Sequence, residues 1–271
     1  MTTPRLKRRS PFRFLVNAWL LVAILIIWEL AARANPTIFF PPLSRIASQF
    51  GTDWLSVDAS HAFLSEHFYD TVVPSMWRLI RGWGLATVVG IVGGVLVARN
   101  SIIRDLYNPM IRFWMATPKV VLLPIALQVF GISDSLNIFL IFFGTVWLIM
   151  VNTADGVTGV DEAWLRSATS MRLRRRDLYL RVIVPAAMPR ILTGIRVSIG
   201  VALILVIISE LYATTAGLGY EVLLNQQSFK YLQMWSAFLL IAVIGLVLNG
   251  GAALLEKRVL RWQRRAGLGE L

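Results

Sequence analysis

The stretch LQMWSAFLLIAVIGLVLNGGAALL, residues 232–255, decides the fold class of this chain. It runs for 24 residues without a charged side chain, and a helix needs about 17–25 mostly apolar residues to cross the hydrocarbon core of a bilayer. The whole chain agrees, because 56% of its residues are hydrophobic and 15% are charged, with a mean hydropathy of +0.65. Soluble domains are nearer a quarter charged. The sequence therefore predicts an all-α integral membrane protein.

Five further apolar stretches bring the expected number of transmembrane helices to six, namely residues 14–32, 82–98, 110–131, 135–151 and 188–208. The third of these contains Arg112, Pro118, Lys119 and Pro124, so we expect a kinked span that faces protein. A cleaved signal peptide is the alternative for residues 14–32, although that stretch is long for one and five spans follow. We expect one transmembrane domain over residues 14–255, between basic ends at 1–13 and 256–271.

Lysine and arginine are distributed unequally between the two sides that these spans define. Twenty-one of the 27 basic residues fall on the side that holds both termini. The positive-inside rule therefore places both termini in the cytoplasm and residues 35–80 outside. The net charge of +12 then indicates contact with anionic lipid headgroups rather than with nucleic acid.

The segment between the first two spans is read as an outer surface layer. Residues 35–60, rich in Pro, Phe and Ser, predict an extended stretch and a short helix. Residues 61–81 predict a separate amphipathic helix at the interface. His61 and His67 would lie on different faces of that helix, and the chain has no cysteine, so we expect no metal site.

Small residues recur at four-residue spacing in the second span, at Ala86, Gly90, Gly94 and Ala98. Such a stripe lets a neighbouring helix approach closely. Packing within the chain is the simplest explanation, and a translocation path along the stripe is the alternative.

Ionisable residues inside apolar spans are costly and therefore informative. Glu29 lies near the outer end of the first span, where it can reach the interface. Glu210 lies at the outer end of the fifth span, shortly before a turn that contains Gly217 and Gly219. Its carboxylate either lines a translocation path or accepts hydrogen bonds from the glycine turn and holds a gate closed.

The long polar segment between the fourth and fifth spans, residues 152–187, carries a second signal. Apolar residues recur at helical spacing at Val160, Trp164, Ala168 and Met171, which predicts a short helix with one apolar face. Arginines follow, and Pro185 and Pro189 then end this structure and turn the chain into the fifth span. A solvated basic loop would explain the arginines but not the apolar face, which requires a packing partner.

At these residues the chain resembles the permease subunits of bacterial ABC importers, in particular the nitrate/sulfonate/taurine branch. The similar stretches are Leu122-Leu123-Pro124, Phe130-Gly131-Ile132, Asn152-Thr153, Val182-Ile183-Val184-Pro185, Leu192-Thr193-Gly194-Ile195-Arg196 and Gly217-Leu218-Gly219-Tyr220. The family's loop signature places its Glu-Ala-Ala at Arg166, Ser167 and Ala168, and its Gly at Arg172. Two signature residues are thus arginine here. Glu162-Ala163 would match only with a four-residue insertion, and the loss of Gly makes the turn at Arg172 uncertain.

The resemblance implies a type I importer permease in the inner membrane. It implies a pair of such permeases, a cytoplasmic ATPase subunit under each, and a periplasmic or lipid-anchored solute-binding protein that delivers a small anion. ATP and Mg²⁺ would bind the ATPase, because every lysine of this chain follows a residue other than Gly and a P-loop is excluded. The expected ATPase contacts are Trp164, Arg166, Ser167, Ala168, Met171, Arg172 and Pro185. An ion-driven secondary transporter is the alternative, although internal repeats and carboxylates at mid-membrane depth, typical of that class, are not evident. A structural scaffold is disfavoured by the apolar helix of the loop.

Overall fold

The computed structural model describes residues 12–56, 62–99 and 101–262, with the backbone alone for residues 12–18. His61 and most of the two basic terminal segments lie outside these ranges. The elements are α1 (Phe12–Ala34), α2 (Leu43–Trp54), α3 (Glu66–Arg99), α4 (Ser101–Ala116), a 3-10 turn (Lys119–Leu122), α5 (Leu123–Phe130), α6 (Asp134–Thr158), α7 (Glu162–Ser170), α8 (Arg175–Leu178), a π-helical turn (Tyr179–Ile183), α9 (Val184–Ala213), α10 (Leu218–Gln227) and α11 (Tyr231–Val259).

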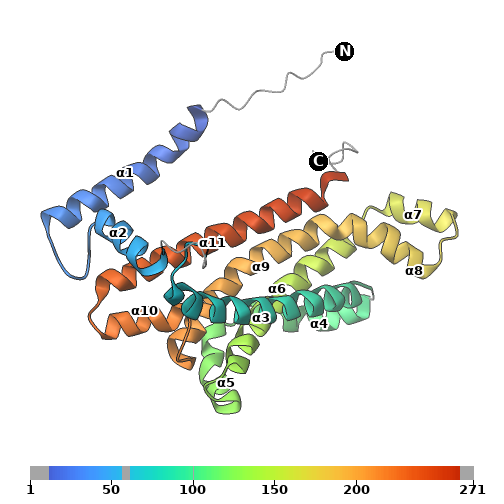
Figure 1. The fold of residues 1–271 in the computed structure, drawn as a ribbon. Coiled ribbons are helices and arrows are strands. Elements are labelled where there is room, and N and C mark those ends of the chain that lie inside the picture. The colour runs from blue at the N-terminus through green and yellow to red at the C-terminus, as the bar shows by residue number, and fades with distance from the viewer. Residues whose placement is uncertain (1–11, 57–61, 100, 263–271) are drawn as a thin grey trace.

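The predicted class is confirmed, because the described residues form a bundle of long apolar helices (Figure 1). Four helical segments there are long and apolar enough to cross a membrane, namely α3, α6, α11 and the continuous run of residues 175–213. A fifth span results if α4 is joined with residues 119–130. α1 covers the predicted first span.

Two boundaries differ from the prediction. α3 is one helix of 34 residues with Pro74 inside it, so the expected interfacial helix and the second span are continuous. The kink expected near Pro118 is a break of 91° between α4 and the following turn and helix. Pro118 takes φ −62° and ψ 118°, an extended conformation that no helix can continue through.

The centre of the bundle is formed by α3, α6 and α9, whose apolar side chains Leu79, Ile141 and Val206 are buried together. The predicted small-residue stripe lies where α3 meets α6. A Cβ atom on Gly90 would lie 2.9 Å from the Cβ of Ile149, and one on Gly94 would lie 2.6 Å from the Cβ of Thr153. Glycine is required at both positions because the two backbones approach too closely for a side chain.

The ends of the bundle carry different structures. α7 and α8 lie at one end, and α2, α5 and α10 lie at the other, as Figure 1 shows. α9 connects the two ends, since it begins directly after the π-helical turn and finishes shortly before α10.

Candidate functional site

Glu210, in the last turn of α9, is fully buried. Its Oε1 accepts a hydrogen bond from Arg78 Nη1 at 2.7 Å. Its Oε2 accepts from Ser75 Oγ at 2.8 Å and from the backbone N–H of Gly219 at 3.0 Å. Both carboxylate oxygens are therefore occupied by donors from α3 and α10, as a buried charge requires.

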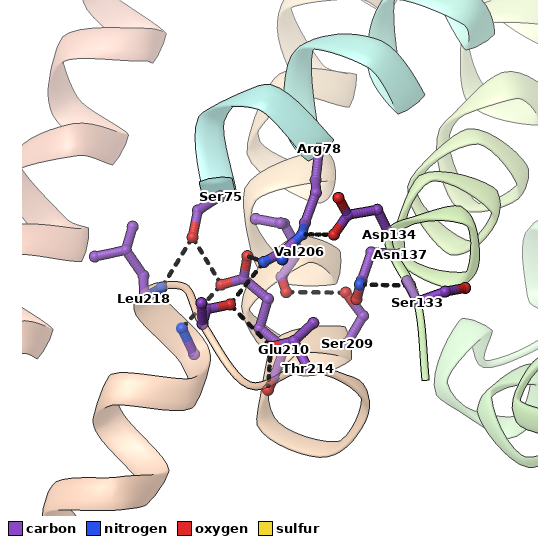
Figure 2. Close-up of polar contacts among 12 residues, drawn as sticks. Ser75, Arg78, Ser133, Asp134, Asn137, Val206, Ser209, Glu210, Thr214 and Leu218 are labelled. Carbon is purple, nitrogen blue, oxygen red and sulfur yellow. Dashed lines mark hydrogen bonds and ion pairs between the residues drawn. The ribbon is translucent and has the colours of Figure 1, made fainter. Parts of the chain in front are cut away.

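Arg78 connects this carboxylate to the bundle surface. Its Nε donates to Asp134 Oδ1 at 2.6 Å, and its Nη1 also donates to the carbonyl of Ala216 at 2.8 Å. The side chain of Arg78 is 8% exposed, whereas that of Asp134 is 57% exposed. A planar guanidinium with several fixed donors suits such a junction. We call Ser75, Arg78, Asp134 and Glu210, with their contacts to residues 216–219, the polar network (Figure 2).

The two glycines that follow Glu210 fit the network by lacking a side chain. Gly217 has φ +124°, and a Cβ atom there would lie 2.5 Å from the Cδ atom of Glu210. A Cβ atom on Gly219 would lie 2.7 Å from the Cβ of Glu210 and would overlap the carbonyl of Ile207. The backbone can thus reach the carboxylate only with glycine at both positions.

The carboxylate of Glu210 accepts from the glycine turn at Gly219, as one of its two interpretations required, and also from Arg78, which was not singled out as a donor. Arg78 was assigned to an interfacial amphipathic helix because the apolar residues of 61–81 recur at mostly helical spacing. The sequence MWRLI, residues 76–80, does carry a signal, since it places one arginine among four apolar residues. Its partner is 132 positions away, beyond the reach of any local pattern.

The predicted contact loop forms a short helix, a tight turn and a second helical segment. Asp161 caps α7, because its carboxylate accepts from the N–H of Ala163 at 2.8 Å. Pro185 occupies the first turn of α9, where proline is tolerated, and Pro189 lies inside that helix. The two prolines therefore do not end the structure of the loop, and the chain is helical from residue 175 to residue 213.

The apolar residues of α7 do not all share one face, which corrects the prediction. Ala168 is 4% exposed and faces the protein, whereas Trp164 is 39% and Met171 is 74% exposed. Leu165, which was not singled out, packs with the buried cluster around Val160. The α7 helix thus uses Leu165 and Ala168 for its own chain and leaves Trp164 and Met171 on the surface.

Arg166 and Ser167 are also exposed, and Arg166 forms an ion pair with Glu162 at 3.2 Å. Arg172 retains the backbone conformation that the family's glycine would take, with φ +51°. The N–H of Arg172 donates to the carbonyl of Thr169, and the N–H of Leu173 donates to that of Ala168. These two bonds form a Schellman motif, which ends α7.

Glu29 and His67 have structural surroundings. Glu29 pairs with Arg33 at 2.6 Å and accepts from Ser44 of α2 at 2.8 Å. His67 stacks on Trp54 and lies 3.3 Å from Glu221. Among the described residues, no group of three His, Cys, Asp or Glu side chains is placed to hold a metal ion.

The chain matches the family described as "Binding-protein-dependent transport system inner membrane component" over residues 87–261. The chain belongs to this family, and its fold is that of a type I ABC importer permease.

Several relatives are permeases by name. A putative ABC transporter permease protein of Methanocaldococcus jannaschii is 28% identical over 88% of both chains. The bicarbonate transport system permease protein CmpB of Synechococcus elongatus is 27% identical over 89% of this chain and 87% of its own. The nitrate import permease protein NrtB of Leptolyngbya laminosa is 28% identical over 69% of this chain and 67% of its own. Among solved structures, a chain of the MetNI methionine ABC transporter in inward-facing form matches with a TM-score of 0.63 at 13% identity, over 70% of this chain and 94% of that one.

Proposed function

We propose that this chain is the non-catalytic permease subunit of an ATP-driven importer of a small inorganic or organic anion. Two copies form the translocation path by alternating access, and each is coupled to a separate ATPase subunit that binds ATP and Mg²⁺. A solute-binding protein delivers the anion on the outer side. Bicarbonate and nitrate in the names of two relatives support the anionic class, and family membership favours this function over an ion-driven secondary transporter.

The observation that carries the proposal is the course of α9. The helix begins at Val184, immediately after the loop that contains α7 and α8, and carries Glu210 in its last turn. Its 30 residues give a rod about 45 Å long. A displacement of the loop by an ATPase subunit is thereby transmitted to the polar network at the far end. In this mechanism the network, with Gly217 and Gly219, is the gate on the outer side.

The exposed side chains of the loop suggest where the ATPase subunit binds. Met171 and Trp164 present apolar surface beside the arginines of residues 172–176, all of which are exposed. Large side chains of this kind dominate binding energy when they enter a partner's pocket. Arg166, Ser167 and Arg172 are exposed nearby in the chain, whereas Ala168 is buried and Pro185 is half-buried.

Exposed apolar surface and the distribution of charge support the proposed second permease copy and the proposed orientation in the membrane. α1 exposes a continuous set of large side chains, including Trp19, Ile24 and Ile27, which a second permease copy or lipid would cover. The asymmetry of basic residues supports cytoplasmic termini, and the family description supports the inner membrane.

The test is binding of the cognate ATPase to the purified permease. Met171→Glu places a charge in the proposed contact and should weaken binding more than tenfold, because a hot-spot loss exceeds about 2 kcal/mol. Ile38→Glu is the matched control, since Ile38 is 64% exposed between α1 and α2 at the opposite end. Binding that is equal in both variants and the wild type would show that the contact lies elsewhere.

A further inference from the structure

A cavity of about 350 Å³ lies at the break between α4 and α5. It is lined by Met115, Ala116, Thr117, Pro118, Lys119, Gly144, Trp147, Leu148 and Val201. The lining comes from the broken span, from α6 and from α9, and is separate from the residues of the polar network.

The cavity lies near the middle of α6, one of the helices long enough to cross a membrane. Gly144 follows the start of α6 at Asp134 by ten residues and precedes its end at Thr158 by 14. These separations correspond to about 15 Å and about 21 Å along the helix. A Cβ atom on Gly144 would lie 3.4 Å from the Cγ of Lys119, so the lysine stem passes Gly144 at this depth.

Lys119 brings a positive charge to that depth without a carboxylate partner. Its ammonium donates to the carbonyls of Trp114, Met115 and Thr117, and none of the ion pairs within the described part of the chain involves Lys119. Arg78, in contrast, contacts two carboxylates. Carbonyl dipoles at the end of α4 stabilise a cation but do not neutralise it. A charge kept at this depth therefore indicates function.

Trp147 also lines this cavity, and its side chain carries a second donor. Its indole Nε1 is buried and has no hydrogen-bond acceptor among the described atoms. The ring is held by stacking with Trp114 at 6.2 Å and by an edge contact with Phe143 at 5.5 Å. An indole N–H can only donate, and leaving it unpaired in a buried position is costly. The N–H of Trp147 therefore remains able to donate to an acceptor.

We propose that Lys119 and Trp147 form a transient binding site for a small oxyanion halfway along the translocation path. The site rests on the proposed function and specifies where the anion is held. An oxyanion such as nitrate or bicarbonate accepts hydrogen bonds from both the ammonium and the indole, and it neutralises the lysine while it passes. The flexible lysine stem allows the ammonium to exchange a carbonyl for the anion and to return afterwards.

The experiment uses the permease reconstituted in proteoliposomes with its cognate ATPase and binding protein. Uptake of labelled nitrate and bicarbonate is measured together with ATP hydrolysis stimulated by the binding protein. Trp147→Phe removes the N–H and keeps an aromatic ring, and Lys119→Gln removes the charge and keeps a donor. We expect each to lower the number of anions imported per ATP by about tenfold, the effect of one hydrogen bond to a charged group. Lys119→Arg should retain most of the uptake.

The control separates this role from a structural one. Trp235→Phe also removes an indole N–H, but that N–H donates to the carbonyl of Phe39 at 3.0 Å. Trp235→Phe should therefore lower the melting temperature and leave the number of anions imported per ATP unchanged. Trp147→Phe should leave the melting temperature unchanged and lower the number of anions imported per ATP. Unchanged import per ATP in both Trp147→Phe and Lys119→Gln would overturn the site while the proposed function stands. A wild-type complex with no stimulated ATP hydrolysis would instead refute the function on which the site rests.

Discussion

The ion pair between Arg78 and Glu210 offers a direct test of what stabilises the end of the bundle that carries α10. Arg78→Gln removes the cation and leaves the carboxylate of Glu210 buried without its charged partner. Removing one member of a buried pair costs about 3–5 kcal/mol, because the remaining charge is uncompensated. Asp134→Asn is the matched change, since it removes the other carboxylate bound to the same arginine at nearly the same distance.

The two changes should differ because only one carboxylate is buried. Asp134 is 57% exposed, whereas Glu210 is 0% exposed. Partly exposed pairs contribute about 0.2–1 kcal/mol. For a chain of this size, 1 kcal/mol shifts the melting temperature by about 2–4 °C. We therefore expect Arg78→Gln to lower it by about 6–20 °C and Asp134→Asn by less than about 4 °C.

The assay is thermal unfolding of the permease in lipid nanodiscs, followed by circular dichroism at a helical wavelength. The double variant Arg78→Gln/Glu210→Gln removes the charge that the single change strands, so it should be more stable than Arg78→Gln alone. Equal, small shifts for Arg78→Gln and Asp134→Asn would refute the argument, and so would a double variant less stable than Arg78→Gln.

Three further predictions concern the turn after α7, helix packing and orientation. Arg172→Gly should stabilise the protein by about 1 kcal/mol, because φ +51° is costly for a residue with a side chain. The control Ser170→Gly, inside α7, should destabilise it, and a lower melting temperature for Arg172→Gly would contradict the assigned turn. Gly94→Ala should destabilise the protein by about 1–3 kcal/mol, since its methyl group would meet Thr153 and the carbonyl of Met150 at 2.6 Å. The control Gly250→Ala, with nothing within 4 Å, should not, and equal melting temperatures for the two variants would contradict the close packing at Gly94. Ser56→Cys should react with a membrane-impermeant maleimide on intact cells and Ser170→Cys only after lysis, and the opposite pattern would reverse the topology.

The chain's apolar stretches were sufficient to predict most of the fold. Residues 232–255 needed no tertiary information, because a bilayer selects helices by length and hydropathy alone. α3 was divided wrongly because the helical spacing of apolar residues over 61–81 predicted an interfacial helix apart from the span at 82–98. Arg78 is in fact buried by partners from α6 and α9, and such pairings between distant segments leave no periodic trace in the sequence.

The loop that contains α7 also depends on contacts with distant segments, which the sequence pattern does not reveal. Helical spacing identified Trp164, Ala168 and Met171 as one face, but a helix of nine residues is oriented by the body on which it rests. Packing selects Leu165 and Ala168 for that contact, and this could not be read from spacing. The turn at Arg172 was not predicted, because the family's Gly is absent there, yet Arg172 takes the positive φ that this way of ending a helix requires.

The two interpretations of Glu210 now differ in what they require of the protein. As a residue that lines a path, it would need water or substrate at its carboxylate, yet the carboxylate is fully buried and both oxygens accept hydrogen bonds from the protein. As part of a gate, it would need interactions strong enough to hold one state and separable enough to release it. Shifting a two-state equilibrium from 99:1 to 1:99 takes about 5.5 kcal/mol, close to the upper value of about 5 kcal/mol for breaking a buried pair. The network thus has the strength that a reversible closure needs. Its donors come from α3 and α10, so a shift of α9 against these helices would separate the carboxylate from its donors.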